Sequence, residues 1–276
     1  MSDDTSHGSR AGTKTTKFTK ITNNHWVFVI VVAFVIFVPA REPWLVRSLM
    51  ARQSAMSPRE AALIVLERAN RPFVPYVAAT GKTLTVVVEL PAASIQAGRW
   101  KNGADVNVMA VGANDEPLAT AKGRLEAGTY SVAIPLAIDK WPARVTIALR
   151  AEGERPADDW VKMEAPVGTL VGEPVAYRSG SRAAARPVAA FDFARSERIR
   201  AEWPILAPLD RREVRLLDRS GKPLAVELPL SEDPAKRALV VDMSLSGIVR
   251  GDYLIELTAG SGGAIERRLL AIRIKP

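Results

Sequence analysis

Short strands and polar turns alternate from Phe73 to the end of this 276-residue chain. Each strand-like run is rich in β-branched residues and is bounded by Gly, Pro, Asn or Asp, which is typical of β-strands joined by tight turns. No long helical pattern separates the runs, so a parallel sheet with crossover helices is excluded. The predicted strands are FVPYVA, TLTVVVEL, ADVNVMAV, TYSVAIPL and ARVTIALRA, followed by RIRAEWPIL, EVRLLDR, PLAVELPL, ALVVDMSL, GDYLIELTA and RRLLAIRIK.

The strands fall into two sets of about 90 residues each, the size of an immunoglobulin-like sandwich of two packed sheets. We therefore predict a mainly β fold with two tandem immunoglobulin-like β-sandwiches. The first covers residues 73–177 and the second covers residues 191–276. Residues 178–190 are rich in Ala, Arg and Ser without a strand period, which predicts a linker between the sandwiches.

The two sets also resemble each other. VNVMAVGANDEPLA, which begins at Val106, has the same plan as VRLLDRSGKPLA, which begins at Val214: a strand, a polar turn, Pro-Leu and then a second strand. A second similarity joins GTYSV, from Gly128, to GDYLI, from Gly251. We interpret these pairs as the trace of one duplicated unit; the alternative is chance similarity between β domains.

The segment before the strands indicates a membrane tether. Residues 1–20 are polar and are predicted to form a disordered cytoplasmic tail. Residues 21–40 carry no formal charge and are wholly apolar from Trp26 to Val38. About 20 such residues are enough to cross a bilayer as a helix, so we predict a transmembrane anchor. The alternative is a signal segment cleaved after Ala40.

Residues 41–72 are predicted to form a short helical stalk. Leu45, Val46 and Leu49 recur at helical spacing. Further on, the run Ser57-Pro58-Arg59-Glu60 has the pattern of a capping box, with proline at the first helical position. We expect this stalk to pack on the first sandwich.

The composition excludes most catalytic chemistry from the strand-rich region. The chain has no cysteine, and its two histidines, His7 and His25, both precede the strands. Disulfides, thiolate zinc sites and histidine general bases are therefore unavailable there. The net charge of +8 is spread among interleaved acids, so a nucleic-acid-binding patch is not predicted. We predict no catalytic residues and no cofactor.

Four acids close together are the best remaining candidates for paired carboxylates or a weak calcium site. The alternative interpretation, a solvated hairpin loop, is the one we favour. The four residues are Glu152, Glu154, Asp158 and Asp159.

Asp242, Ser244 and Ser246 form a D-x-S-x-S run, the pattern with which a metal-dependent adhesion site begins in von Willebrand A domains. Only 30 residues follow Ser246, and their turn-and-strand pattern supplies no helix after the motif. One carboxylate and two hydroxyls also leave magnesium coordination incomplete. We therefore predict no metal site here, but a strand with outward serines. The packing residues of that strand are predicted to be Val240, Met243 and Leu245.

Tryptophans in turn-like contexts could stack against sugars. Trp100 lies in GRWKNG, and Trp160 closes the acidic run; these two are our candidates for glycan stacking. Trp141 in DKWPAR and Trp203 in AEWPIL are further examples. The competing interpretation is that these rings fill the cores.

The end of the chain, RLLDRSGKPLAVELPLSE with GDYLIELTAGS and RRLLAIRIKP, resembles the C-terminal part of bacterial VWFA-related proteins, often labelled "VWFA-related acidobacterial domain". IQAGRWKNGADVNV, LVGEPVAYR and FDFARSERIRAEWP are similar to the region behind the A domain in that family. The resemblance covers residues 73–276 and rests on structural turns and strand cores. It implies an exported bacterial protein. The A domain itself is not expected in this chain, so no metal ligand is carried over.

Together these observations predict a non-enzymatic, exported interaction protein of the bacterial cell envelope. It would be anchored in the inner membrane with periplasmic domains, or exported if cleaved after Ala40. Its expected partner is another envelope protein, such as one that carries an A domain. The alternative function is that of an envelope carbohydrate-binding protein.

Overall fold

The computed structural model describes residues 57–67, 71–165, 168–180 and 185–275. Residues 56–276 form one compact unit. The predicted tail, the predicted anchor and the part of the predicted stalk before Ser57 lie outside the described residues. Among the residues described, no helix is both long and apolar enough to cross a membrane.

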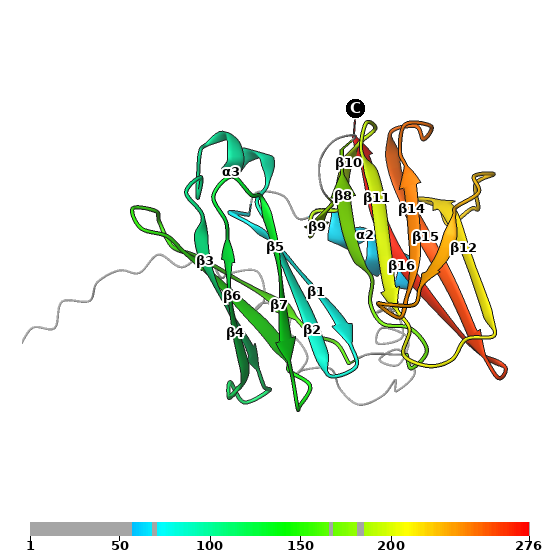
Figure 1. Ribbon diagram of the computed structural model, residues 1–276, viewed down its shortest axis with the longest axis horizontal. Helices are drawn as coiled ribbons and strands as arrows, with labels where there is room; N and C mark the ends of the chain where they lie inside the picture. The colour runs from blue at the N-terminus through cyan, green and yellow to red at the C-terminus, as the bar shows by residue number, and fades with distance from the viewer. Residues whose placement is uncertain (1–56, 68–70, 166–167, 181–184, 276) are drawn as a thin grey trace, which may run out of the picture. The chain divides into compact units, whose positions relative to one another are not determined.

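The first sandwich consists of two antiparallel sheets with the strand orders β1-β2-β5 and β4-β3-β6-β7 (Figure 1). Buried and exposed residues alternate along β3 and β6, as expected when one face of a sheet packs on the core. A short helix, α3, follows β2. The bounds are β1 Val74–Thr80, β2 Thr83–Glu89, α3 Ala92–Gln96, β3 Ala104–Val111, β4 Pro117–Leu125, β5 Ser131–Ala137, β6 Arg144–Arg150 and β7 Ala157–Lys162.

The second sandwich has a five-stranded sheet, β13-β14-β11-β8-β9, and a four-stranded sheet, β10-β16-β15-β12. Among the strands that the structure describes, only β10 and β16 pair in parallel. The Tyr253 hydroxyl donates a 2.8 Å hydrogen bond to the Val249 carbonyl, like the tyrosine corner of immunoglobulin sandwiches. The bounds are β8 Val175–Ser179, β9 Arg186–Val188, β10 Asp192–Ala194, β11 Arg198–Pro204, β12 Arg211–Asp218, β13 Leu230–Asp233, β14 Ala238–Ser244, β15 Gly251–Ser261 and β16 Ala264–Lys275.

Each sandwich encloses its own apolar core, and the mainly β prediction is confirmed. The first core contains Phe73, Trp100 and Leu84, and the second contains Trp203 and Phe193. These side chains are almost completely removed from water. Burial of large apolar side chains is the dominant favourable contribution to the stability of such a fold.

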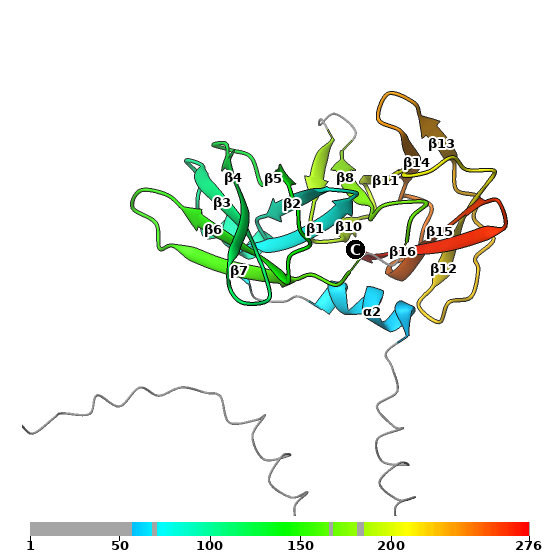
Figure 2. The same cartoon turned by 90° about the horizontal axis from the view of Figure 1, so that it is seen from below.

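The helix α2 (Pro58–Ile64) begins with the predicted capping box. The Ser57 hydroxyl accepts from the Glu60 amide at 3.2 Å, and the Glu60 carboxylate accepts from the Ser57 amide at 2.8 Å. The helix and the 3-10 turn η1 (Val65–Glu67) contact β16, as Figure 2 shows, and Leu66 enters the core of the second sandwich. We expected packing on the first sandwich; the apolar side of the helix instead meets the second.

The boundary between the sandwiches differs from the predicted one. β8 pairs with β11, and β9 pairs with β8, so residues 175–179 and 186–188 belong to the second sandwich. The described parts of the connection are residues 163–165 and 168–174, not the predicted residues 178–190. Two strands as short as these carry no clear period, and the arginines between their apolar residues make the segment look solvated.

Other differences concern single strands. The run PLAVELPL, from Pro223, forms only an isolated bridge to Leu217 before β13 begins. A strand after Pro117 was expected only from the internal similarity, and β4 lies there; β7 was not predicted, because polar and charged residues occupy its outward positions. The two prolines of PLAVELPL, Pro223 and Pro229, remove backbone donors that a regular strand would need.

The internal similarity is preserved in one of its two parts. Val106 lies on β3 and Val214 on β12, and each of these strands pairs with a later strand, β6 and β15 respectively. The correspondence is partial, because β3 also pairs with β4, whereas β12 is the edge strand of its sheet. By contrast, the stretch from Gly128 leads into β5, which pairs with β2, whereas the stretch from Gly251 begins β15, which pairs with β12. The second sequence similarity therefore joins strands that are not equivalent.

Candidate functional site

The two predicted glycan-stacking tryptophans have opposite environments. Trp100 is only 1% exposed and belongs to the first core, so its ring is not available to a ligand, and that assignment is corrected. Trp203 is equally buried, and Trp141 packs against the first core. Trp160 is 56% exposed on β7 and remains a candidate.

The four candidate acids do not form a carboxylate pair. Asp158 and Asp159 are successive residues of β7 and so point to opposite faces of the sheet. Asp158 pairs with Arg150 at 2.6 Å, and Asp159 pairs with Arg71 at 2.6 Å. A third acid, Glu154, lies 3.8 Å from a different arginine, Arg99, and the fourth, Glu152, is exposed. Within the described ranges no group of three metal-ligating side chains is found.

The D-x-S-x-S run lies at the end of β14. Asp242 pairs with Arg198 at 2.8 Å, and the hydroxyls of Ser244 and Ser246 are 3.1 Å apart. Both serines are exposed, as we predicted. The residues predicted to pack, Val240, Met243 and Leu245, are buried.

The outward side of the sheet β4-β3-β6-β7 brings distant residues together around Trp160. The register places Thr120, Met109, Thr146 and Trp160 in one row across the four strands. The row two residues along repeats this arrangement with other side chains. We call the two rows the Trp160 face: Asn107, Met109, Thr120, Lys122, Thr146, Ala148, Asp158 and Trp160.

The Trp160 face is hollowed into a groove of about 650 Å³. Met109, 37% exposed, and Trp160 stand on β3 and β7, with β6 between them. The side chains of β6 at these positions, Thr146 and Ala148, are short and form the floor. Because adjacent strands lie about 4.8 Å apart, the two walls are about 10 Å apart. That width suits one extended chain lying along the strands.

Several polar groups of this face have no partner within the described parts of the protein. Neither a hydrogen bond nor an ion pair is made by the side chains of Asn107, Thr120 and Lys122. In contrast, Thr146 donates to the Met109 carbonyl at 3.3 Å, and Asp158 is held by Arg150. The unpaired groups can therefore donate to or accept from a ligand.

Sequence reasoning selected Trp160 but missed the rest of this face. The available signal was the alternation in ADVNVMAV and ARVTIALRA, which predicts one outward side for each strand. Which outward sides meet in one sheet depends on the strand order, and β7, which carries Trp160, was not predicted as a strand. The face therefore required the tertiary structure.

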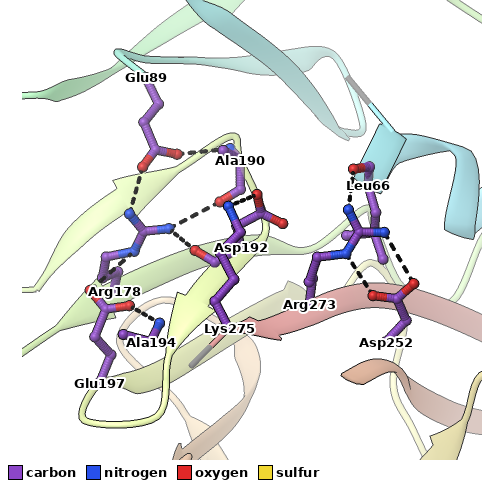
Figure 3. Close-up of polar contacts among 10 residues, drawn as sticks. All are labelled: Leu66, Glu89, Arg178, Ala190, Asp192, Ala194, Glu197, Asp252, Arg273 and Lys275. Carbon is purple, nitrogen blue, oxygen red and sulfur yellow. Dashed lines mark hydrogen bonds and ion pairs between the residues drawn. The ribbon is translucent and has the colours of Figure 1, made fainter. Parts of the chain in front are cut away.

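A second polar cluster joins the two sandwiches, as Figure 3 shows. Glu89, the last residue of β2, accepts a 2.9 Å hydrogen bond from Arg178 on β8. Its other carboxylate oxygen accepts from the amides of Ala189 and Ala190 at 2.8 and 2.7 Å. The side chains are 6% exposed for Glu89 and 14% for Arg178. Burial raises the pKa of Glu89, although Arg178 and the two amides act in the opposite direction.

Arg178 holds several segments of the second sandwich at this junction. It donates to the carbonyls of Ala190 and Asp192 at 3.1 and 2.5 Å, and its Nε lies 3.6 Å from Glu197. Its guanidinium also lies over the ring of Phe193, 5.0 Å from the centroid. One cation thus connects β2 of the first sandwich with β8 and the segment before β10 in the second. We call Glu89 and Arg178 the junction pair.

The helix and the connection are fixed by two further carboxylates. Asp252 accepts from Arg273 at 2.7 and 3.1 Å, and Arg273 also donates to the Leu66 carbonyl at 3.1 Å (Figure 3). Hydrogen bonding to Arg273 lowers the pKa of Asp252. These contacts attach the end of η1 to β15 and β16.

Glu266 on β16 binds the chain that connects the sandwiches. Its carboxylate accepts from three successive amides, those of Thr169, Leu170 and Val171, at 2.5, 2.9 and 3.4 Å. Burial opposes ionisation of Glu266, but the three amides and Arg268 outweigh it, and the pKa is lowered. A charged carboxylate that accepts backbone amides in this way fixes the path of the connection.

No family model and no curated protein matches this chain. Solved structures with which it shares a likeness include tandem immunoglobulin domains A164–A165 of titin, at 9% identity and a TM-score of 0.21, covering 74% of this chain and 97% of that one. The titin domains I67–I69 are 12% identical, with a TM-score of 0.23, and the match covers 74% of this chain and 66% of the titin chain. A marsupial T cell receptor is 11% identical, with a TM-score of 0.25, and the match covers 74% of this chain and 73% of the receptor chain. Likenesses at these scores carry no argument about function.

Proposed function

We propose that this protein is a non-enzymatic, membrane-tethered interaction protein of the bacterial cell envelope, with the Trp160 face as its binding surface. The observation that carries the proposal is the exposed groove between Met109 and Trp160, with unpaired polar side chains beside it. Exposed apolar groups rimmed by polar ones mark binding surfaces. The tether rests on the apolar sequence of residues 21–40, and the bacterial envelope is what the resemblance to VWFA-related proteins implies.

The proposal includes no catalytic step, because the candidate aspartates are paired with arginines. In the described part of the chain, Asp158, Asp159 and Asp242 are each engaged by an arginine, on separate strands or separate faces. No histidine or cysteine occurs after His25 that could act as a base or nucleophile. Binding, rather than turnover, is the function that this arrangement supports.

The junction supports the proposal through the contacts that hold the two sandwiches together. The junction pair is buried, and Glu266 holds the connection between the sandwiches. A binding surface on a preorganised frame loses less conformational freedom when the ligand arrives.

A protein partner in the envelope, such as one that carries an A domain, is tested by site-specific cross-linking. A photoreactive residue is placed at Met109 in the full chain, and in parallel at Val249, which is 68% exposed on the second sandwich. Cross-linking in intact cells is followed by mass spectrometry of the membrane fraction. We expect one dominant product from position 109 that position 249 does not give. Equal products from both positions, or none from position 109, would contradict the proposed binding surface.

A second candidate function, carbohydrate binding, is favoured by one specific observation. The exposed ring of Trp160 lies on the same face as the unpaired side chains of Asn107, Thr120 and Lys122. An aromatic ring beside free hydrogen-bonding groups suits a ligand that has both C–H faces and hydroxyls.

A further inference from the structure

We infer that the Trp160 face binds a linear polysaccharide that carries carboxylate groups. The inference rests on the second candidate function, carbohydrate binding, because it names the chemical class of the ligand for the same binding surface. Three properties of the face carry it: the exposed ring, the row of short side chains that forms the floor, and the excess of positive charge.

The exposed ring provides a stacking surface. Trp160 lies on β7, the last strand of its sheet, and more than half of its side chain is open to solvent. The faces of an indole ring are electron-rich and attract the weakly positive C–H groups on one side of a sugar ring. A fully apolar protein partner would bind this face less tightly, because it would bury Asn107 and Thr120 without giving them hydrogen bonds.

The floor of the groove favours an extended ligand. Thr146 and Ala148 are two residues apart on β6, so the short side chains continue along the strand direction. The walls on β3 and β7 follow the same direction. A chain of sugar rings laid along β6 would meet Trp160 on one side and Asn107 on the other. The amide of Asn107 can both donate to and accept from hydroxyl groups.

The charge on this face is complementary to carboxylates. Three arginines that border the face are already paired with aspartates at 2.6 to 2.7 Å. Lys122 and Lys162 lie on the outward side, and in the described parts of the chain no acid pairs with either of them. These two ammonium groups leave an excess of positive charge beside the groove, which favours an anionic ligand. The three paired arginines are Arg124, Arg144 and Arg150.

The test is calorimetric titration of the detergent-solubilised full chain with a tetrasaccharide of galacturonic acid, and with neutral cellotetraose of the same length. We expect the uronate to bind at least tenfold more tightly than the neutral chain. Trp160→Ala should weaken uronate binding at least tenfold, and Lys122→Glu should weaken it by a similar factor. The matched controls are Val249→Ala, for loss of an exposed apolar group, and Lys140→Glu, for the same charge change at an exposed turn.

Three results would overturn the inference. These are no uronate binding, equal binding of the two tetrasaccharides, or uronate binding that Trp160→Ala leaves unchanged. If the uronate tetrasaccharide does not bind but the cross-linker at Met109 still captures one envelope protein, the proposed binding surface stands. Only the assignment of a polysaccharide ligand is then contradicted. If both experiments fail, the Trp160 face is not a binding surface.

Discussion

The junction between the sandwiches and the Trp160 face are both rich in polar side chains, but they use them differently. At the junction, Glu89 and Arg178 are nearly removed from water, and together they bind several backbone groups. On the Trp160 face, Asn107, Thr120 and Lys122 are exposed, and within the described residues their side chains bind nothing.

The comparison separates polar groups that serve the fold from those available for binding. A buried polar group must find its partners inside the protein, because an unpaired one costs free energy. An exposed polar group is satisfied by water and can exchange that water for a ligand. Substitutions at the junction should therefore change stability, and substitutions on the face should change binding alone.

The largest expected effect is that of Arg178→Ala. Removal of this cation leaves Glu89 buried without its charged partner, which should lower the free energy of unfolding by about 3–5 kcal/mol. The measurement is urea denaturation of the full chain. Arg198→Ala, which breaks the exposed pair with Asp242, is the matched control and should cost less than about 1 kcal/mol. Equal effects of the two substitutions would show that the junction pair does not support the fold.

Glu266→Ala should have a smaller effect on the same measurement. It removes the acceptor of three amides in the connection, and loss of hydrogen bonds to a charged group costs about 2–3 kcal/mol. The neighbouring exposed residue provides the control, and Ile265→Ala should be near neutral. If Glu266→Ala is also neutral, water replaces the carboxylate and the connection is not held by it.

The two glutamates should affect the pH dependence of stability with opposite signs. In the folded protein the pKa of Glu266 lies below the ordinary value of 4.5. The contribution of Glu266 to the stability of the fold is therefore present above pH 4.5 and is lost as the pH falls through the folded pKa. The folded pKa of Glu89 lies above 4.5, so its contribution is full below that pH and is lost as the pH rises through the folded pKa.

Denaturation of the wild type and of the glutamine variants at about pH 4 and about pH 7 measures this difference. The stability that the wild type has over Glu266→Gln should grow from pH 4 to pH 7. The stability that it has over Glu89→Gln should shrink over the same interval. Parallel trends would show that Arg178 and the two amides outweigh burial at Glu89.

The smallest effect on stability should come from Trp160→Ala. An exposed side chain far from the core changes the free energy of unfolding by no more than about 0.5 kcal/mol. Trp203→Ala, in the second core, should cost about 3–5 kcal/mol and serves as the contrast. The measurement is thermal unfolding of both variants, which compares their losses of stability relative to the wild type. A large loss of stability in Trp160→Ala would mean that the ring supports the sheet. The exposure of Trp160 would then no longer indicate a ligand-binding surface.

Local patterns in the sequence were sufficient for much of the fold. The period of the strands predicted a mainly β fold. The run from Ser57 to Glu60 predicted a capping box that the structure confirms. The apolar pattern before Ser246 predicted a strand with outward serines, and Val240, Met243 and Leu245 are buried while Ser244 and Ser246 are exposed. Each of these depends on interactions between residues that are close in the chain.

The tertiary structure alone decided what lies beside what. Trp100 and Trp160 occupy similar polar contexts in sequence, yet one fills a core and the other faces solvent. The capped helix precedes the first sandwich but packs on the second, and Arg178, within the predicted linker, pairs with Glu89 across the junction. The physical reason is that burial and cross-strand pairing depend on the order of strands in a sheet. That order brings together residues that are far apart in the sequence, and local propensity carries no information about it.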